Sequence, residues 1–136
     1  MVAVGATIIA AVAIPLIEKG TDYAKQTTLQ ENLRVLREQI ELYRIQHGGS
    51  LPAVEDGRMP QLTSATNAQG GTGEPGRKFP FGPYLRGGVP VNPKTGRSLV
   101  TPLTDFPPTA PSGNGGWLYH PATGKIVPDL EDHLGD

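Results

Sequence analysis

A glycine pattern in the middle of the chain is its most suggestive chemical motif. Gly71, Gly73 and Gly76 stand at the spacing G-x-G-x-x-G, which in dinucleotide-binding domains lets the backbone approach a pyrophosphate. That chemistry needs a strand before the glycines and a helix after them, so that the phosphates meet the helix N-terminus. No strand pattern precedes this motif, and Pro75 with the residues after it begins no helix. The sequence therefore predicts no nucleotide cofactor.

Side chains that could form a hydrolytic or metal-dependent active site are scattered along the chain. The three histidines, His47, His120 and His133, are not spaced as a metal-binding pair, and there is no cysteine. The serines lack the strand–turn–helix context of a nucleophile. These serines are Ser50, Ser64, Ser98 and Ser112. We therefore expect no enzyme activity, and no catalytic, cofactor-binding or metal-binding residue is assigned.

Charged side chains are balanced over the chain but gather at its end. With 12 Lys and Arg against 13 Asp and Glu, the formal net charge is -1, which lacks the basic excess typical of nucleic-acid binding. Carboxylates cluster after residue 128. They are Asp129, Glu131, Asp132 and Asp136. Oxygen ligands of this kind suit Ca²⁺, but the spacing is not that of an EF-hand, so we expect a solvated acidic terminus.

The elements that must position these residues begin with an apolar stretch. Residues 1–17 contain no charged side chain, and Thr7 is their only polar one. As a helix they would be about 25 Å long, near the lower limit for crossing a hydrocarbon core. A cleaved signal peptide would begin with a basic residue, and a buried core helix would need more apolar cover than this chain offers. The sequence predicts a transmembrane or filament-core helix with a kink at Pro15.

Residues 18–47 are predicted to continue this helix in amphipathic form. Apolar side chains recur every three or four residues and form one stripe: Leu29, Leu33, Leu36, Ile40 and Tyr43. On the solvated face Arg34 should pair with Glu38, four residues on. Arg37 should pair with Glu41 in the same way. Two glycines, a serine and a proline then end the helix. We expect the stripe to pack onto the domain that follows.

The composition changes sharply at residue 48. Of the 18 Gly and 14 Pro residues, only three come earlier, and this density favours short strands joined by turns. Residues 61–78 are polar and glycine-rich, which predicts a mobile surface loop. Aromatic side chains near the turns should form a small core beneath the helix. They are Phe79, Phe81, Tyr84, Trp117 and Tyr119.

The pattern Pro-x-Thr-Gly occurs twice, at residues 93–96 and 121–124, and each copy predicts a hairpin turn. Residues 117–119 and 125–127 should be the two strands of the second hairpin, and residues 97–101 the strand after the first turn. The predicted fold is therefore α+β, with a long N-terminal helix, transmembrane and then amphipathic, packed on a small antiparallel β-sheet. Its regions are 1–17, 18–47 and a Gly/Pro-rich β domain at 48–136.

Three stretches together resemble a known family. Residues 3–15 are apolar and end in a proline. Residues 31–48 close a helix with Leu-Tyr-Arg-Ile-Gln-His-Gly, and Leu-Pro follows at 51–52. Residues 82–90 begin Gly-Pro-Tyr-Leu, with Asn-Pro at 92–93. In this order they are similar to the type IV pilin-like proteins, and specifically to the major pseudopilin of type II secretion systems.

The resemblance implies a pilin-like fold and a structural role. Such a subunit would sit in the bacterial inner membrane as a single-pass protein, with its C-terminal domain in the periplasm or outside the cell. It would polymerise with identical or related subunits through the apolar helix and work with the secretion machinery. Calcium is implied for the family, but no ligand is matched here. The family's processing motif, Gly then Phe-Thr-Leu-Ile-Glu, is absent, because Met1 aligns inside the mature helix.

Two alternatives remain open from the sequence. The chain could be a type IV pilus or competence pilin, although the segment at 82–85 favours secretion. It could also be a membrane-anchored periplasmic binding module whose apolar helix stays in lipid.

Overall fold

The computed structural model describes residues 17–136, with side chains from residue 21 on. This part of the chain is α+β, as predicted, with one long helix and small antiparallel and mixed sheets. The predicted transmembrane segment, with its kink at Pro15, lies outside the described residues except for Ile17. From residue 17 onward, no helix combines the length and the apolar character needed to cross a membrane.

The long helix α2 spans Ile17–Gln46 and buries the predicted stripe. All five stripe residues are at most 3% exposed, which confirms that this face packs onto the domain. Residues Gly48 and Gly49 follow with φ of 65° and 97°. Because glycine adopts this left-handed conformation without steric cost, the helix ends where the sequence predicts.

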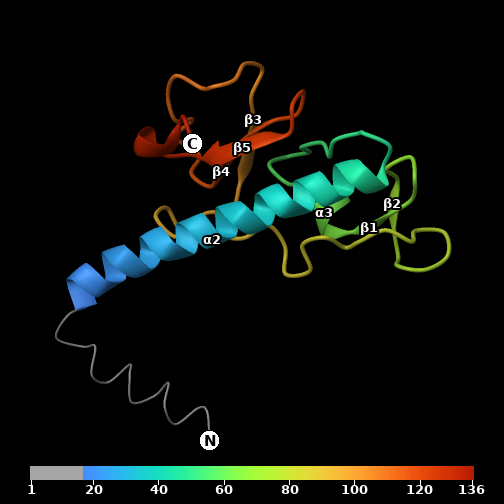
Figure 1. Ribbon diagram of the computed structural model, residues 1–136, viewed down its shortest axis with the longest axis horizontal. Helices are drawn as coiled ribbons and strands as arrows, with labels where there is room; N and C mark the ends of the chain where they lie inside the picture. Colours follow the sequence, from blue (N-terminus) through green and yellow to red (C-terminus); the bar gives the residue numbers. More distant parts are fainter. Residues whose placement is uncertain (1–16) are drawn as a thin grey trace, which may run out of the picture.

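The first part of α2 extends beyond the domain. Figure 1 shows the helix emerging on one side, away from every strand. Between residues 21 and 28 every side chain is exposed except that of Gln26, which is half-buried. Among the described side chains full burial begins at Leu29, so the roughly two turns of helix formed by residues 21–28 have little cover from the domain.

The larger sheet lies beside the middle of α2 (Figure 1) and has the order β3-β4-β5. Strands β4 (Trp117–His120) and β5 (Lys125–Pro128) form the predicted second hairpin. The prediction for the first turn is wrong in part, because residues 92 and 97 form only an isolated bridge. Strand β3 (Val100–Pro102) instead runs parallel to β4. The crossover at residues 103–116 is long enough to permit this parallel pairing.

A second small unit contacts the C-terminal end of α2. The helix α3 (Pro60–Thr63) leads into β1 (Ala65–Thr66), which pairs antiparallel with β2 (Thr72–Gly73). The prediction of a mobile loop at 61–78 is therefore wrong for its first half, in which Leu62, Ala65 and Thr66 are at most 1% exposed.

The core lies between α2, the hairpin β4–β5 and the segment 59–62. Trp117 and Tyr119 are fully buried in it, and Tyr84 packs against its edge. The indole N–H of Trp117 donates to the carbonyl of Pro90 at 2.8 Å, which ties the strand to the chain segment before the first turn. Phe79 and Phe81 are half-buried and lie outside this cluster, so the prediction of an aromatic core holds for three of the five rings.

Candidate functional site

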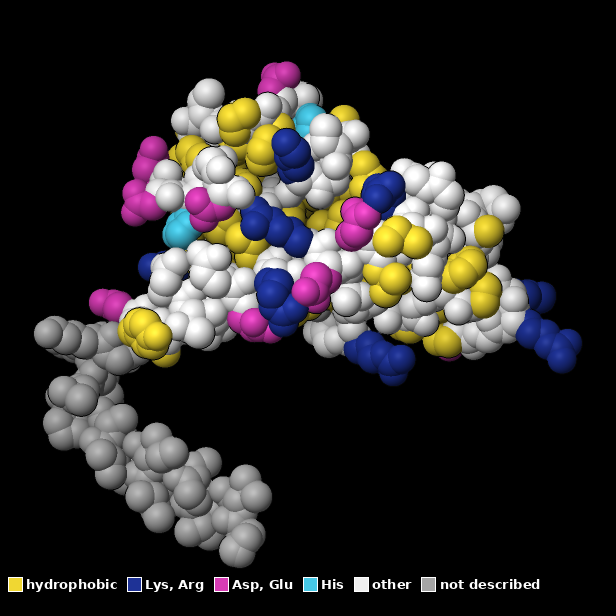
Figure 2. Space-filling view, in the orientation of Figure 1, with side chains coloured by type: hydrophobic (Ala, Val, Ile, Leu, Met, Phe, Trp, Pro, Cys, Tyr) yellow, Lys and Arg dark blue, Asp and Glu magenta, His cyan; other side chains and the backbone are white. Residues whose placement is uncertain are grey.

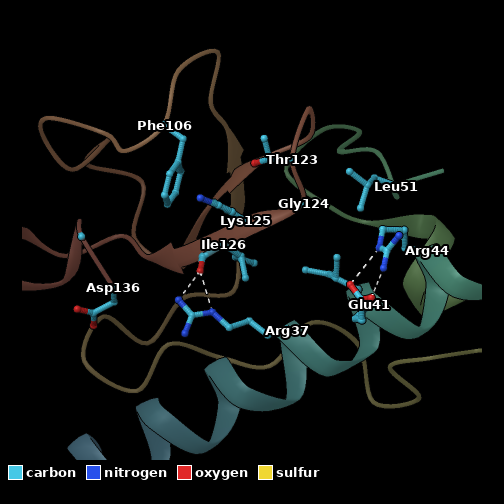
Figure 3. A pocket seen from close by; sticks show the side chains of 12 residues that line it. Arg37, Glu41, Arg44, Leu51, Phe106, Thr123, Gly124, Lys125, Ile126 and Asp136 are labelled. Atoms are coloured by element: carbon cyan, nitrogen blue, oxygen red, sulfur yellow. Dashed lines mark hydrogen bonds and ion pairs between the residues drawn. The ribbon is translucent and has the colours of Figure 1, made fainter. Parts of the chain in front are cut away.

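A cleft of about 410 Å³ lies between α2 and the hairpin β4–β5 (Figure 3). Its apolar lining includes Ile40 from the helix, Leu51 from the segment after it, and Phe106 from the crossover. Charged groups line it from α2, β5 and the C-terminal segment. They are Arg37, Glu41, Arg44, Lys125 and Asp136. This volume lies within the range of pockets that accept a small ligand or a protruding side chain.

Arg37 does not form the predicted pair with Glu41. Its Nε and Nη2 atoms donate instead to the backbone carbonyl of Ile126, at 3.3 and 2.9 Å. Because β5 is an edge strand, this contact covers a carbonyl that would otherwise be open to another strand. Partial burial lowers the pKa of the guanidinium, and the nearby Asp136 raises it by a smaller effect.

The other charges of the cleft are arranged in two groups. Glu41 pairs with Arg44 on the helix, and this hydrogen bond lowers the pKa of the Glu41 carboxyl. The Lys125 ammonium lies 5.4 Å from the centre of the Phe106 ring, within the range of a cation–π contact. Figure 3 shows the Lys125 side chain directed toward Phe106, and the Arg37 side chain reaching from the helix to the Ile126 carbonyl; both side chains line the cleft.

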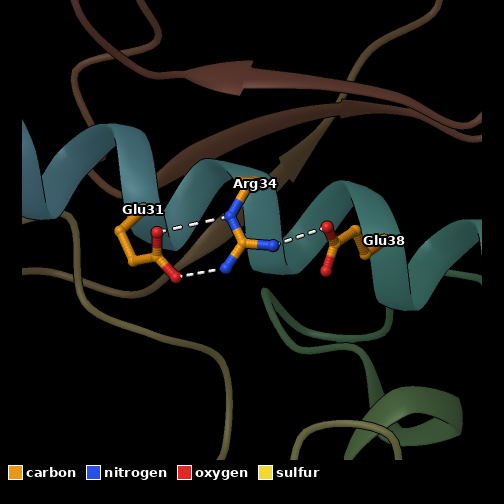
Figure 4. A network of polar contacts seen from close by, with 3 residues as sticks. All are labelled: Glu31, Arg34 and Glu38. Atoms are coloured by element: carbon orange, nitrogen blue, oxygen red, sulfur yellow. Dashed lines mark hydrogen bonds and ion pairs between the residues drawn. The ribbon is translucent and has the colours of Figure 1, made fainter.

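The solvated face of α2 carries a separate ion-pair network (Figure 4). Arg34 pairs with Glu38, as predicted, and also with Glu31 one turn earlier. The hydrogen bond from Arg34 lowers the pKa of Glu31. Figure 2 shows cations and carboxylates interleaved over this face, with no patch of one sign.

The acidic terminus is only partly solvated, contrary to the prediction. Asp129 is 4% exposed, and its carboxylate accepts hydrogen bonds from the backbone N–H and the hydroxyl of Ser112. Glu131 and Asp132, in the 3-10 turn η2 (Glu131–His133), are exposed. Because both oxygens of Asp129 are occupied, this carboxylate holds the crossover at residues 103–116 against β5. Among residues 17–136, no group of three or more His, Asp and Glu side chains could hold a metal ion.

The histidines belong to three separate contacts. His47 is buried, with Nδ1 bonded to the Tyr43 carbonyl and Nε2 to the hydroxyl of Thr66, both at 2.8 Å. Its ring stacks on that of Tyr43 at 3.7 Å. His120 bonds to Thr123 within the hairpin turn, and His133 pairs with its neighbour Asp136. The three histidine side chains therefore lie in separate parts of the domain.

The glycine pattern at 71–76 has a packing role. Gly73 lies in β2, and a Cβ placed there would come within 2.3 Å of the Phe79 ring. Only glycine leaves room for that ring. A phosphate site would need a helix that begins directly after the glycines, and none begins there.

The cleft was missed by sequence reasoning because its charges come from three distant parts of the chain. The sequence feature that could have indicated the cleft is Arg37, which lies next to the buried stripe of the helix rather than on the opposite face. We found no protein-family model, curated protein or solved structure that matches the chain.

Proposed function

We propose that this chain is a structural subunit of a pseudopilus-type filament in protein secretion, with a pilin-like arrangement of helix and sheet. Its apolar N-terminal segment would anchor it in the bacterial inner membrane before assembly and pack against identical or related subunits afterwards. The folded domain would then lie in the periplasm or outside the cell. The sequence resemblance at residues 3–15, 31–48 and 82–90 supports this assignment.

The observation that carries the proposal is the bare first part of α2. Residues 17–28 are helical, and from residue 21 on all their side chains except that of Gln26 are exposed, although this stretch is rich in weak helix formers: Gly20, Thr21, Asp22, Thr27 and Thr28. Because the packed part of α2 already supplies a helical nucleus, these residues only extend it, but weak helix formers at a helix end without packing partners tend to fray in water. A stretch of this composition needs packing partners, and copies of the same helix in a bundle would provide them.

Cysteine crosslinking tests this assembly. The chain has no cysteine, so a variant with Ala10→Cys and Ala24→Cys offers one defined pair. In a filament, a neighbouring copy displaced along the helix by about 21 Å brings residue 24 of one copy beside residue 10 of the next. We expect oxidation in membranes to give a ladder of oligomers. Each single variant serves as the control and should give dimers at most.

The cleft favours a second candidate function, a membrane-anchored periplasmic binding module. Its volume and its lining, which is partly apolar and carries three cations against two carboxylates, would suit a small anionic ligand. In that case the anchored copies need no ordered contact, and the double-cysteine variant should give no ladder. A type IV pilus or competence pilin would give the same ladder as a pseudopilin, and would be separated from it by the absence of a secretion defect on deletion.

A further inference from the structure

The projecting part of α2 presents an aromatic side chain and a carboxylate side by side. Tyr23 is 76% exposed, the highest value among the large hydrophobic side chains of the described residues. Asp22 precedes it and makes no ion pair with any side chain from residue 21 on. Tyrosine is among the side chains that most often anchor contacts between proteins.

The cleft beside β5 has the complementary chemistry. Its two carboxylates already have partners within the molecule, Glu41 with Arg44 and Asp136 with His133. Its apolar lining includes Phe106, whose ring centre lies 5.4 Å from the Lys125 ammonium.

Two cations of the cleft have no such partner. Lys125 and Arg37 make no ion pair with any described side chain, although both line the same cleft. The carbonyl of Ile126 holds Arg37 in position, and Asp136 lies close enough to raise the pKa of Arg37 but forms no ion pair with it. The cleft therefore offers a fixed guanidinium, an exposed ammonium and an apolar wall to an incoming carboxylate and ring.

The two surfaces cannot meet within one molecule. Asp22 and Arg37 lie on the same continuous helix, fifteen residues apart, which separates them by about 22 Å. A contact between them must join two copies, and it joins unlike surfaces. Heterologous contacts of this kind generate open filaments when the rotation between copies does not close.

We propose that Tyr23 of one copy inserts into the cleft of a second copy, and that Asp22 of the first copy pairs there with Lys125 and Arg37. The inference rests on the proposed filament function and names the contact that would fix the axial displacement between neighbours. The ring would pack against Phe106, and the carboxylate would neutralise the unpaired cations.

Crosslinking with the charged residues left in place tests this contact. Thr123 lines the cleft and is exposed, and Ala24 is exposed beside Tyr23. We expect the full chain with Ala24→Cys and Thr123→Cys, oxidised in membranes, to give a ladder of oligomers. The control pair, Ala24→Cys with Ala68→Cys on the loop between β1 and β2, should give none.

Charge reversal separates a specific contact from chance proximity. Lys125→Glu in the Ala24/Thr123 cysteine background should lower the crosslinking rate at least about tenfold, since it faces Asp22 with a like charge. Adding Asp22→Lys should restore the rate. Lys94→Glu, on an exposed lysine away from the cleft, should leave it unchanged.

The outcomes distinguish the contact from the filament itself. If the Ala10/Ala24 pair gives a ladder and the Ala24/Thr123 pair does not, the contact is wrong and the filament stands. If neither pair gives a ladder, both proposals fail. A ladder from Ala24/Thr123 that is insensitive to Lys125→Glu, or is not restored by Asp22→Lys, also overturns the proposed contact.

Discussion

Asn92 is the buried polar side chain that joins the first turn to the larger sheet. It is fully buried, and its Nδ2 donates to the carbonyl of Gly116 at 2.8 Å while its Oδ1 accepts from the N–H of Lys94 at 3.0 Å. The backbone of Gly116 passes so close to Leu99 that a Cβ there would lie 2.0 Å from the Leu99 carbonyl oxygen. The turn and the start of β4 are thus held together by one amide and one glycine.

Replacing this amide should be costly. We expect Asn92→Ala to lower the free energy of unfolding by about 1–3 kcal/mol, because it removes two hydrogen bonds of a fully buried side chain, each worth about 0.5–1.5 kcal/mol. Urea unfolding followed by the fluorescence of Trp117, the single tryptophan, measures the change. Lys94→Ala, at an exposed neighbour, should change stability by about 0.5 kcal/mol or less. Equal effects of the two variants would show that the Asn92 side chain has no special role.

Tyr119 makes the stability depend on alkaline pH. Its hydroxyl donates to the carbonyl of Pro52 at 2.9 Å, and burial raises its pKa above the ordinary value of 10.0. The folded protein therefore keeps this proton while the unfolded chain loses it, so stability is full below pH 10 and falls as the pH rises above it. We expect Tyr119→Phe to be less stable at pH 7 by about 1–3 kcal/mol, since it leaves the carbonyl unsatisfied.

The same variant should also lose less stability above pH 10. The slope of unfolding free energy against pH should be shallower by at most about 1.4 kcal/mol per pH unit. Urea titrations between pH 8 and pH 11 measure both effects. Tyr23→Phe, at an exposed tyrosine, should behave as the wild type. An unchanged alkaline slope in Tyr119→Phe would mean that Tyr119 ionises freely in the folded state.

Several contacts of single side chains could not be predicted from the sequence. The role of Asp129 was not predictable, because its partner Ser112 lies seventeen residues earlier in a crossover with no periodic pattern. Arg37 was assigned to Glu41 on helix spacing alone. Arg37 instead donates to the Ile126 carbonyl at the edge of β5. Glu41 pairs with Arg44, which lies one turn nearer the C-terminal end of the helix.

At the scale of elements, α2 was predictable because its pattern is long and regular. The spacing of its apolar residues fixes the buried face whatever that face packs against. We expect Leu36→Ala, at a fully buried position, to lower the free energy of unfolding by about 2–5 kcal/mol. Leu42→Ala, at a position 40% exposed on the same helix, should cost about 0.5 kcal/mol or less.

Chemical denaturation of both leucine variants, again with Trp117 as the probe, compares the two faces directly. A loss at Leu42 as large as that at Leu36 would place the buried face elsewhere.

The strands were harder to predict than the helix. The hairpin β4–β5 carries a local signal, the proline and glycine of its turn, and was found. Strand β3 pairs with β4 across the crossover at residues 103–116, and no local pattern records that pairing. Strands β1 and β2 have two residues each, too few for an alternating pattern to show.

At the scale of the whole molecule, the long helix extends beyond one side of the domain that it packs on. Its 30 residues extend about 45 Å, and the part before Leu29 lies beyond the folded domain (Figure 1). This extension of the helix beyond the domain follows from the sequence, because the buried stripe begins only at Leu29 while the helix begins at Ile17. The sequence of a single chain could not predict what packs against the part of α2 before Leu29, because the proposed contacts come from other copies.

Amide hydrogen exchange over residues 18–28 tests the central claim, that neighbouring copies stabilise the bare part of α2. The full chain should be compared as assembled in membranes and as monomers dissolved in detergent. We predict that these amides exchange at least about tenfold more slowly in the assembled state, while the amides of residues 33–43 are equally protected in both. Equal protection of residues 18–28 in monomers and in assembled protein would contradict the account, because the helix would then need no partner.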